Sequence, residues 1–227
     1  MKSLPSLEPF EDASLDPPVR GFLHRPAQAS GDGLILTHGA GGNCQAPLLR
    51  AVADRLVHDG LFVLRCNLLY RQLRSYGPPR PGDAARDRAG LANAVGALKA
   101  LSRGRMFLGG HSYGGRQSTM LAADSSPLVD GLLLMSYPLH PPRQHAQLRV
   151  QHFPSLETRA VFVHGTRDPF GSPEELTAAL KLIPAETRLL TVEGAGHDLG
   201  FKGKGTQADL PERIQRAFLE FFGTARK

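Results

Sequence analysis

The sequence contains no tryptophan and only two cysteines, Cys44 and Cys66. Two cysteines allow at most one disulfide, and their separation matches no CxxC pair or other zinc-binding spacing, so we interpret them as reduced thiols. The chain also carries no HExxH motif and no sequence cluster of cysteine and histidine. We therefore expect neither a metal ion nor an organic cofactor.

Long hydrophobic runs are absent as well. No apolar segment approaches the roughly 18–20 residues that a membrane-spanning helix needs. The N-terminal sequence MKSLPSLEPFEDASLDPP carries a single lysine, several acids and prolines, and no apolar core typical of a secretory signal. These absences predict a soluble, cytoplasmic protein with no membrane partner.

The formal net charge is +6, which raises the question of nucleic-acid binding. Arginines supply most of the positive charge and are scattered along the whole chain. The densest stretch, residues 65–88, is interrupted by Asp83 and Asp87 and contains no aromatic stacking platform or RNA-binding motif. We expect a solvated basic face and no nucleic-acid partner.

Short apolar runs alternate with helical patterns, which is typical of a parallel sheet with helices on both faces. The length of 227 residues fits one large domain. We predict a single doubly wound α/β domain over residues 15–223, a flexible segment over 1–14 and a tail over 224–227. Strands are predicted at residues 34–37, 61–64, 106–108, 129–135, 160–163 and 188–192, with an antiparallel edge strand at 19–23. Helices are predicted at residues 47–57, 83–101, 114–123, 173–182 and 211–222.

In such a sheet, functional residues gather at the carboxyl ends of the strands. Gly110, Ser112 and Gly114 form a G-x-S-x-G pattern between a predicted strand and a predicted helix, which is the context of a nucleophile elbow. The glycines leave room for a sharp turn that exposes the serine hydroxyl. The simpler interpretation is a glycine-rich turn with a surface serine.

A serine nucleophile needs a base, and the base needs an acid that orients it. In this architecture the acid and then the histidine follow the serine along the chain. Asp168 follows the fifth parallel strand and His197 follows the sixth, so we predict a Ser112–Asp168–His197 triad. The alternatives are a loop-stabilising aspartate and a structural loop histidine.

The negative charge of a tetrahedral intermediate needs two preorganised N–H donors. We predict the amides of Tyr113 and Ala40, with Gly41 as the second choice for the latter. Gly39 and Gly41 are expected to line the substrate site. His38 and His111 are expected to support the loops rather than to transfer protons.

Asn67, Tyr70 and Arg71 follow the second parallel strand, and we expect them to border the substrate pocket. Arg71 or Arg74 would then favour an anionic substrate. The alternative is a surface guanidinium paired with an acid.

Three segments together carry a family resemblance: residues 38–42 (HGAGG), 110–114 (GHSYG) and 164–168 (HGTRD). With these motifs the chain resembles the α/β-hydrolase superfamily. Residues 64–71 and 167–171 are similar, more specifically, to a small lid-less bacterial group related to testis-expressed hydrolase-like proteins and to a subunit of a nuclear acetyltransferase complex. The resemblance covers residues 15–223 and implies a hydrolase fold with a triad. The group also includes members that act by binding rather than by catalysis.

These residues predict a serine hydrolase that cleaves a small ester, thioester or amide through an acyl-enzyme on Ser112. The alternatives are acyl transfer, perhydrolysis or C–C cleavage on the same fold, or a non-catalytic binding or scaffold protein with a vestigial triad. Residues 136–159 are too few to build a separate lid domain, which disfavours a long-chain lipase. The partner is expected to be a small molecule, and the sequence does not predict the oligomeric state.

Overall fold

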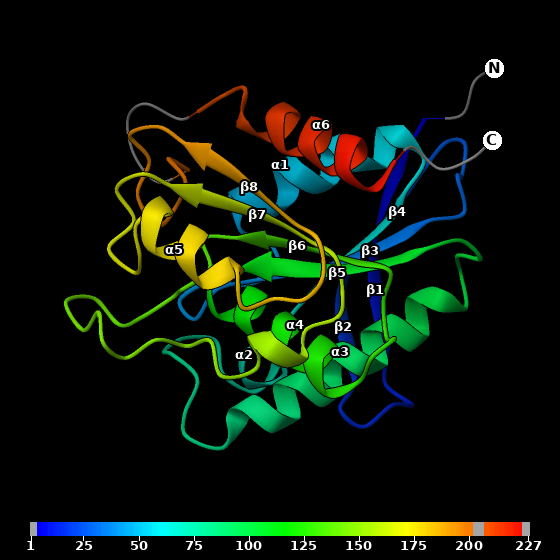
Figure 1. Ribbon diagram of the computed structural model, residues 1–227. Helices are drawn as coiled ribbons and strands as arrows, with labels where there is room; N and C mark the ends of the chain where they lie inside the picture. Colours follow the sequence, from blue (N-terminus) through cyan, green and yellow to red (C-terminus); the bar gives the residue numbers. More distant parts are fainter. Residues whose placement is uncertain (1–3, 202–206, 224–227) are drawn as a thin grey trace.

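The computed structural model describes residues 4–201 and 207–223. These residues form one eight-stranded sheet in the order β1-β2-β4-β3-β5-β6-β7-β8, with helices on both faces (Figure 1). The six strands β3 to β8 pair with one another in parallel. Strand β2 pairs antiparallel with β4 on one side and with β1 on the other. The strands are β1 (Ser6–Asp12), β2 (Val19–Arg25), β3 (Gly33–Thr37), β4 (Phe62–Cys66), β5 (Met106–His111), β6 (Gly131–Met135), β7 (Ala160–Gly165) and β8 (Thr187–Val192).

The helices divide between the two faces of the sheet, as predicted for a doubly wound domain. One face is covered by α1 and α6, and the other by α3, α4 and α5 (Figure 1). Every residue of β3, β6 and β7 is buried, because helices cover both sides of these strands. The helices are α1 (Pro47–Leu56), α2 (Leu69–Leu73), α3 (Asp83–Lys99), α4 (Tyr113–Asp124), α5 (Pro173–Leu180) and α6 (Leu210–Phe222).

The N-terminal region differs from the prediction. Residues 1–14 were expected to be flexible, but Ser6–Asp12 forms β1 and pairs with β2 over its whole length. Two acids of this segment have cross-strand partners: Glu11 pairs with Arg20 at 2.8 Å and Glu8 with Arg25 at 2.6 Å. The sheet therefore begins before residue 15, and the strand expected at its edge lies inside it. The predicted tail at 224–227 lies outside the described residues.

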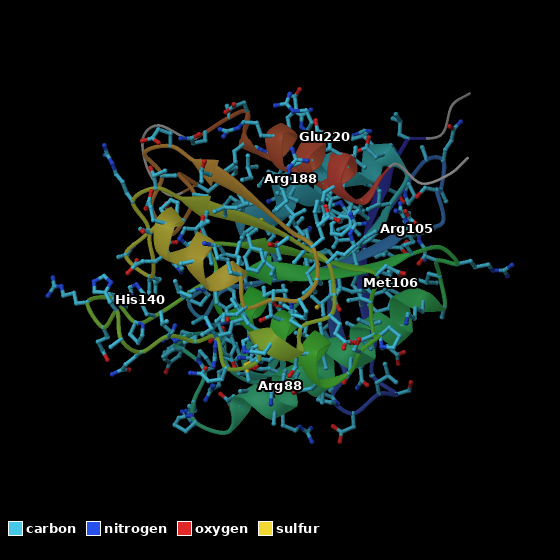
Figure 2. The ribbon with its side chains drawn as sticks, in the orientation of Figure 1. Arg88, Arg105, Met106, His140, Arg188 and Glu220 are labelled. Atoms are coloured by element: carbon cyan, nitrogen blue, oxygen red, sulfur yellow. The ribbon has the colours of Figure 1, made fainter. Side chains whose placement is uncertain are left out.

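Two ion pairs join elements near the amino ends of the strands, and Figure 2 labels Arg105, Arg188 and Glu220 of these pairs. Arg105, directly before β5, contacts the buried carboxylate of Asp32 at 2.7 Å, and Asp32 also accepts the backbone N–H of Arg105. Arg188 of β8 pairs with Glu220 of α6 at 2.8 Å. The carboxyl ends of the strands, where the predicted site residues lie, are at the opposite edge of the sheet.

The connection between β6 and β7 contains one short 3₁₀ turn, Phe153–Ser155, and no inserted helical domain. The molecule therefore has no lid at this position, as the sequence predicted. Across the described ranges, we find no helix with the length and apolar character that a bilayer crossing requires.

Two buried histidines, His24 and His38, and the half-buried His152 are held neutral by the fold. Burial lowers the pKa values of His24, His38 and His152 from 6.5 to about 4. The unfolded chain therefore binds these protons at a higher pH than the folded chain does. We expect the free energy of unfolding to fall as the pH drops from about 6.5 towards 4, by up to about 1.4 kcal/mol per pH unit for each fully buried histidine.

Urea unfolding followed at a series of pH values tests this expectation. His152 lies outside the candidate site, and its Nε2 lies 2.8 Å from the hydroxyl of Thr119. Glutamine at this position keeps a hydrogen-bonding group but does not titrate, so His152→Gln should give a shallower slope than the wild type. A stability that stays constant between about pH 6.5 and 4 would contradict the assignment of neutral buried histidines.

Candidate active site

Ser112 occupies the sharp turn between β5 and α4. Its backbone angles are φ 52° and ψ −117°, a region that non-glycine residues rarely enter. A Cβ atom on Gly110 would lie 2.5 Å from the carbonyl oxygen of Thr37, and one on Gly114 would lie 2.5 Å from that of His38. Both glycines of the motif are therefore required so that β5 and α4 can pass close to β3. The turn presents the Ser112 hydroxyl at the carboxyl edge of the sheet.

Asp168 and His197, predicted from their places after β7 and β8, meet Ser112 at this edge. Nε2 of His197 lies 2.7 Å from Oγ of Ser112, and Nδ1 lies 2.8 Å and 3.0 Å from the two carboxylate oxygens of Asp168. An ionised carboxylate only accepts hydrogen bonds, so Nδ1 carries the proton and Nε2 is free to accept the serine proton. This is the arrangement that nucleophilic catalysis by serine needs.

Further contacts fix the orientation of the His197 ring and of the Asp168 carboxylate. The Phe170 ring lies against the imidazole with centroids 4.2 Å apart, and the Phe170 N–H donates to Oδ1 of Asp168 at 2.9 Å. Nε2 of His111 lies 2.7 Å from the backbone carbonyl of His197. The side chain of Asp168 is fully buried, whereas that of His197 is 22% exposed. The imidazole is therefore reachable, while the carboxylate that orients it is shielded from water.

The loop after β3 lies beside Ser112 and turns its carbonyl groups away from it. The Tyr70 hydroxyl donates to the Ala40 carbonyl at 2.9 Å and lies 3.3 Å from that of Gly39. The C=O and N–H of one planar trans peptide point in opposite directions. We therefore expect the N–H groups of Ala40 and Gly41 to face the cavity at Ser112. The amide of Tyr113 is the first of α4 and has no partner within the helix.

His38 supports this loop. Its Nε2 accepts the N–H of Leu68 at 3.2 Å, so Nδ1 carries the proton and donates to the Gly39 carbonyl at 2.9 Å. Burial lowers its pKa to about 4, which keeps this donor–acceptor pattern at neutral pH. His38 therefore acts on the backbone of the loop.

Asn67, Tyr70 and Arg71 lie behind the same loop and do not line the cavity, contrary to their predicted position. Asn67 accepts the N–H of Cys44. The Arg71 guanidinium donates to the carbonyls of Gly42, Ala40, Arg74 and Gly77 at 2.8 to 3.2 Å. Its donors are directed to backbone oxygens, so Arg71 positions the loop rather than selecting an anionic substrate.

Asp87 is a buried acid in α3 whose role the sequence analysis missed. One carboxylate oxygen accepts the Tyr70 N–H at 3.0 Å and the other accepts the Tyr113 hydroxyl at 2.9 Å. Burial raises its pKa. Asp87 lies four residues before Leu91 and so shares the inward face of α3, which was the available signal. It connects the segment behind the Ala40 loop to the start of α4.

We expect Asp87→Asn to lower kcat about 10- to 100-fold with little change in KM. Asparagine has the same shape but only one acceptor oxygen, which the Tyr70 N–H requires because it can only donate. The NH₂ group then faces the Tyr113 hydroxyl, which loses its hydrogen bond to a charged acceptor, a loss of about 1–3 kcal/mol. Steady-state kinetics on an ester substrate measure the effect. The control is Asp124→Asn, at an exposed carboxylate that ends α4. An unchanged kcat in folded Asp87→Asn would exclude the positioning role.

The cavity at Ser112 has a volume of about 290 Å³, at the small end of ligand pockets. Of the predicted residues, Gly39, Ala40 and Gly41 line it together with Ser112 and His197. Its other walls, which sequence reasoning did not identify, are mostly apolar: Ala46, Pro47, Leu48, Leu49, Phe170 and Phe201, with Gly42, His111 and Asp198. Apolar residues at helical spacing are indistinguishable from core residues in a sequence, which explains the omission.

Comparisons with known proteins agree with this architecture. A family model described as an alpha/beta hydrolase domain matches residues 30–223. The chain is similar to the solved structure of dienelactone hydrolase from Anabaena variabilis, with 20% identity and a TM-score of 0.75 over 96% of this chain and 99% of that chain. It is also similar to an alpha-beta serine hydrolase homologue from Coxiella burnetii, with 20% identity and a TM-score of 0.73, over 92% of this chain and 96% of that chain. A third similar structure, from Xanthomonas campestris, is described as a serine hydrolase without a lid. It has 16% identity and a TM-score of 0.71, over 100% of this chain and 99% of that chain.

Proposed function

This chain belongs to the alpha/beta hydrolase family, and we propose that it is a serine hydrolase that cleaves small esters through an acyl-enzyme on Ser112. The observation that carries the proposal is the continuous contact from Ser112 Oγ through the His197 ring to Asp168, with distances of 2.7 and 2.8 Å. An ester is favoured over an amide because an alcohol is the better leaving group.

In the first half-reaction, Ser112 Oγ attacks the acyl carbon while His197 Nε2 takes the hydroxyl proton. The carbonyl oxygen becomes negatively charged, and the N–H groups of Ala40 and Tyr113 are proposed to bind it. When the tetrahedral intermediate collapses, the C–O bond to the alcohol breaks and His197 returns the proton to the leaving oxygen. Water, deprotonated by His197, then attacks the acyl-enzyme and releases the acid and free Ser112.

Asp168 keeps the imidazole in the tautomer that accepts at Nε2 and stabilises the imidazolium formed during attack. Because Asp168 is shielded from water, its charge acts on His197 with little screening. The role of the protein is thus to position one nucleophile, one base and two N–H donors around the acyl carbon.

The walls of the cavity support a small, uncharged acyl group. They are mostly aliphatic or aromatic, and the Arg71 guanidinium, which was expected to attract an anion, is directed to backbone carbonyls. Arg74, the other candidate, pairs with Asp83. The small cavity and the absence of a lid between β6 and β7 disfavour long acyl chains.

A series of p-nitrophenyl esters from acetyl to dodecanoyl tests the proposal. We expect kcat/KM to be highest for short acyl groups and to fall with chain length. Ala46 lines the cavity, so Ala46→Leu should reduce activity on longer esters more than on the acetyl ester, which serves as the internal control. Folded protein with no activity on any ester would contradict the proposal. Products measured with water, alcohol or peroxide as acceptor distinguish hydrolysis from acyl transfer and perhydrolysis.

A further inference from the structure

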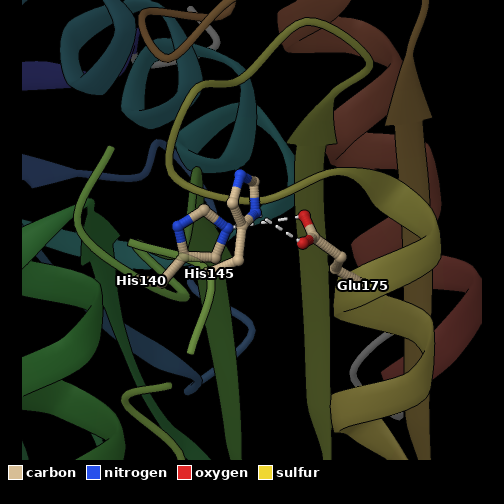
Figure 3. A group of neighbouring side chains, drawn as sticks. All are labelled: His140, His145 and Glu175. Carbon is tan, nitrogen blue, oxygen red and sulfur yellow. Dashed lines mark hydrogen bonds and ion pairs between the residues drawn. The ribbon is translucent and has the colours of Figure 1, made fainter. Parts of the chain in front are cut away.

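A second group of polar side chains lies on the loop that follows β6 and on the first turn of α5. His140 and His145 come from the loop, and Glu175 comes from the helix (Figure 3). Nε2 of His140 is 3.4 Å from Oε2 of Glu175, and Nδ1 of His145 is 2.8 Å from Oε1. One nitrogen or oxygen atom from each residue lies within 4.8 Å of the other two. None of the three residues lines the cavity at Ser112.

The tautomer of His140 indicates that a proton or a cation is needed between its ring and the Glu175 carboxylate. Its Nδ1 lies 2.8 Å from the Pro141 carbonyl, which only accepts, so Nδ1 carries a proton. In the neutral ring, Nε2 then presents a lone pair towards the Glu175 carboxylate. Two acceptors repel each other unless a proton or a cation lies between them. His140 is fully buried, so a charged ring without full compensation is costly there.

The hydrogen bond from His140 Nδ1 to a backbone carbonyl is typical of histidines that bind metals. Such a histidine almost always donates its other ring N–H to a carbonyl or a carboxylate, which fixes the ring and its tautomer. His140 does so through the Pro141 carbonyl. Its Nε2 is thereby held in the orientation that a metal ion needs.

Glu175 supplies a carboxylate ligand that is fixed by α5. It occupies the third position of α5, where its carboxylate accepts the Ser172 N–H at 2.8 Å in a capping box. Its two carboxylate oxygens also face His140 and His145. The carboxylate is therefore held in place by α5 rather than by the loop that carries the two histidines.

We propose that His140, His145 and Glu175 bind one Zn²⁺ ion through Nε2, Nδ1 and a carboxylate oxygen. Imidazole and carboxylate are common zinc ligands, and bonds of about 2.0–2.2 Å in a tetrahedron place neighbouring ligand atoms about 3.3–3.6 Å apart. The 3.4 Å separation between His140 and Glu175 fits this geometry. The 2.8 Å distance between His145 Nδ1 and Glu175 Oε1 has to lengthen slightly, which the 68% exposed His145 side chain permits. Water completes the fourth position.

The ion would act as a structural brace for the acid of the active site. The backbone N–H of His140 donates to the Phe170 carbonyl at 3.0 Å, and the Phe170 ring packs on His197. Fixing His140 to α5 therefore fixes the turn that carries Asp168 and Phe170. Zinc is accordingly expected to raise the melting temperature without being required for ester hydrolysis. Sequence analysis predicted no metal site, because Glu175 lies 35 residues from His140 and the pair forms no local motif.

The test is a calorimetric titration of Zn²⁺ into full-length, tag-free protein that has been stripped with a chelator. We expect one equivalent to bind, and Co²⁺ to give the visible absorption bands of a four-coordinate site. Loss of an outer-shell partner weakens metal binding about 10- to 100-fold, so loss of a ligand in His145→Ala or Glu175→Gln should weaken it at least that much. Glutamine retains the capping box at this position, so Glu175→Gln should keep α5 intact. His145→Ala changes an exposed residue.

The matched controls are His58→Ala and Glu174→Gln, which alter an exposed histidine and the exposed acid next to Glu175. Both should bind Zn²⁺ as the wild type does. The triad is a competing place for a metal ion, since it also contains a histidine and a carboxylate. Binding that keeps its affinity in both His145→Ala and Glu175→Gln would place the ion elsewhere and overturn the proposal. Wild-type protein that binds no Zn²⁺ would show that the group is held by protons alone, which would also overturn it.

Discussion

Replacing Ser112 with alanine is expected to lower kcat on esters by about a million-fold, to the level left by the N–H donors and substrate binding alone. Alanine has no hydroxyl to form the acyl-enzyme. It does have the same Cβ as serine and therefore adds no new strain at the positive φ of the turn. Steady-state kinetics measure the loss, and an unchanged melting temperature shows that the fold is intact. Folded Ser112→Ala that retains a substantial share of the activity would exclude Ser112 as the nucleophile.

Replacing Asp168 with asparagine is expected to cost about ten-thousand-fold in kcat, because the imidazole adopts the wrong tautomer. Oδ1 of Asp168 accepts the Phe170 N–H, so the asparagine oxygen must take that position and its NH₂ group must face Nδ1 of His197. Nδ1 then becomes the acceptor and Nε2 carries the proton. A protonated Nε2 cannot accept the proton of Ser112.

The kinetics of Asp168→Asn distinguish this effect from a general loss of structure. KM should change little, and the melting temperature should stay near that of the wild type. Asp59→Asn, at an exposed carboxylate, is the control and should leave kcat unchanged. A loss of less than tenfold in Asp168→Asn would mean that another group orients His197.

The fold and the three candidate catalytic side chains could be predicted from the sequence because each signal is local. A strand, a turn of defined glycines and a helix surround Ser112, and the acid and base follow later strands in a fixed order. Since parallel strands end at one edge of a sheet, that order alone brings Asp168 and His197 to Ser112. The structure places their side chains in hydrogen-bonding contact.

The supporting contacts could not be predicted in the same way, because they depend on which way a polar side chain turns. Arg71 has a long, flexible side chain that could equally reach solvent, and only the structure shows it directed to backbone carbonyls. Asp87 is one charged residue among many in a basic stretch. Phe170 and Leu48 line the cavity, yet in the sequence they are typical of core residues.

Long-range pairing escaped prediction for a different reason. The acids and prolines near the N-terminus are typical of a flexible segment, but Glu8 and Glu11 are neutralised by arginines on β2. The group formed by His140, His145 and Glu175 likewise depends on how one loop packs against α5. In both cases the partner that determines the structure is separated along the chain.

The central claim, that Ser112 is an activated nucleophile, is tested most directly by the intact mass of the protein after exposure to a fluorophosphonate. This reagent phosphonylates a serine whose proton is taken by a neighbouring base, with loss of fluoride. We expect one adduct on the wild type and none on Ser112→Ala. Folded wild-type protein without an adduct, or equal labelling of Ser112→Ala, would contradict the proposed mechanism.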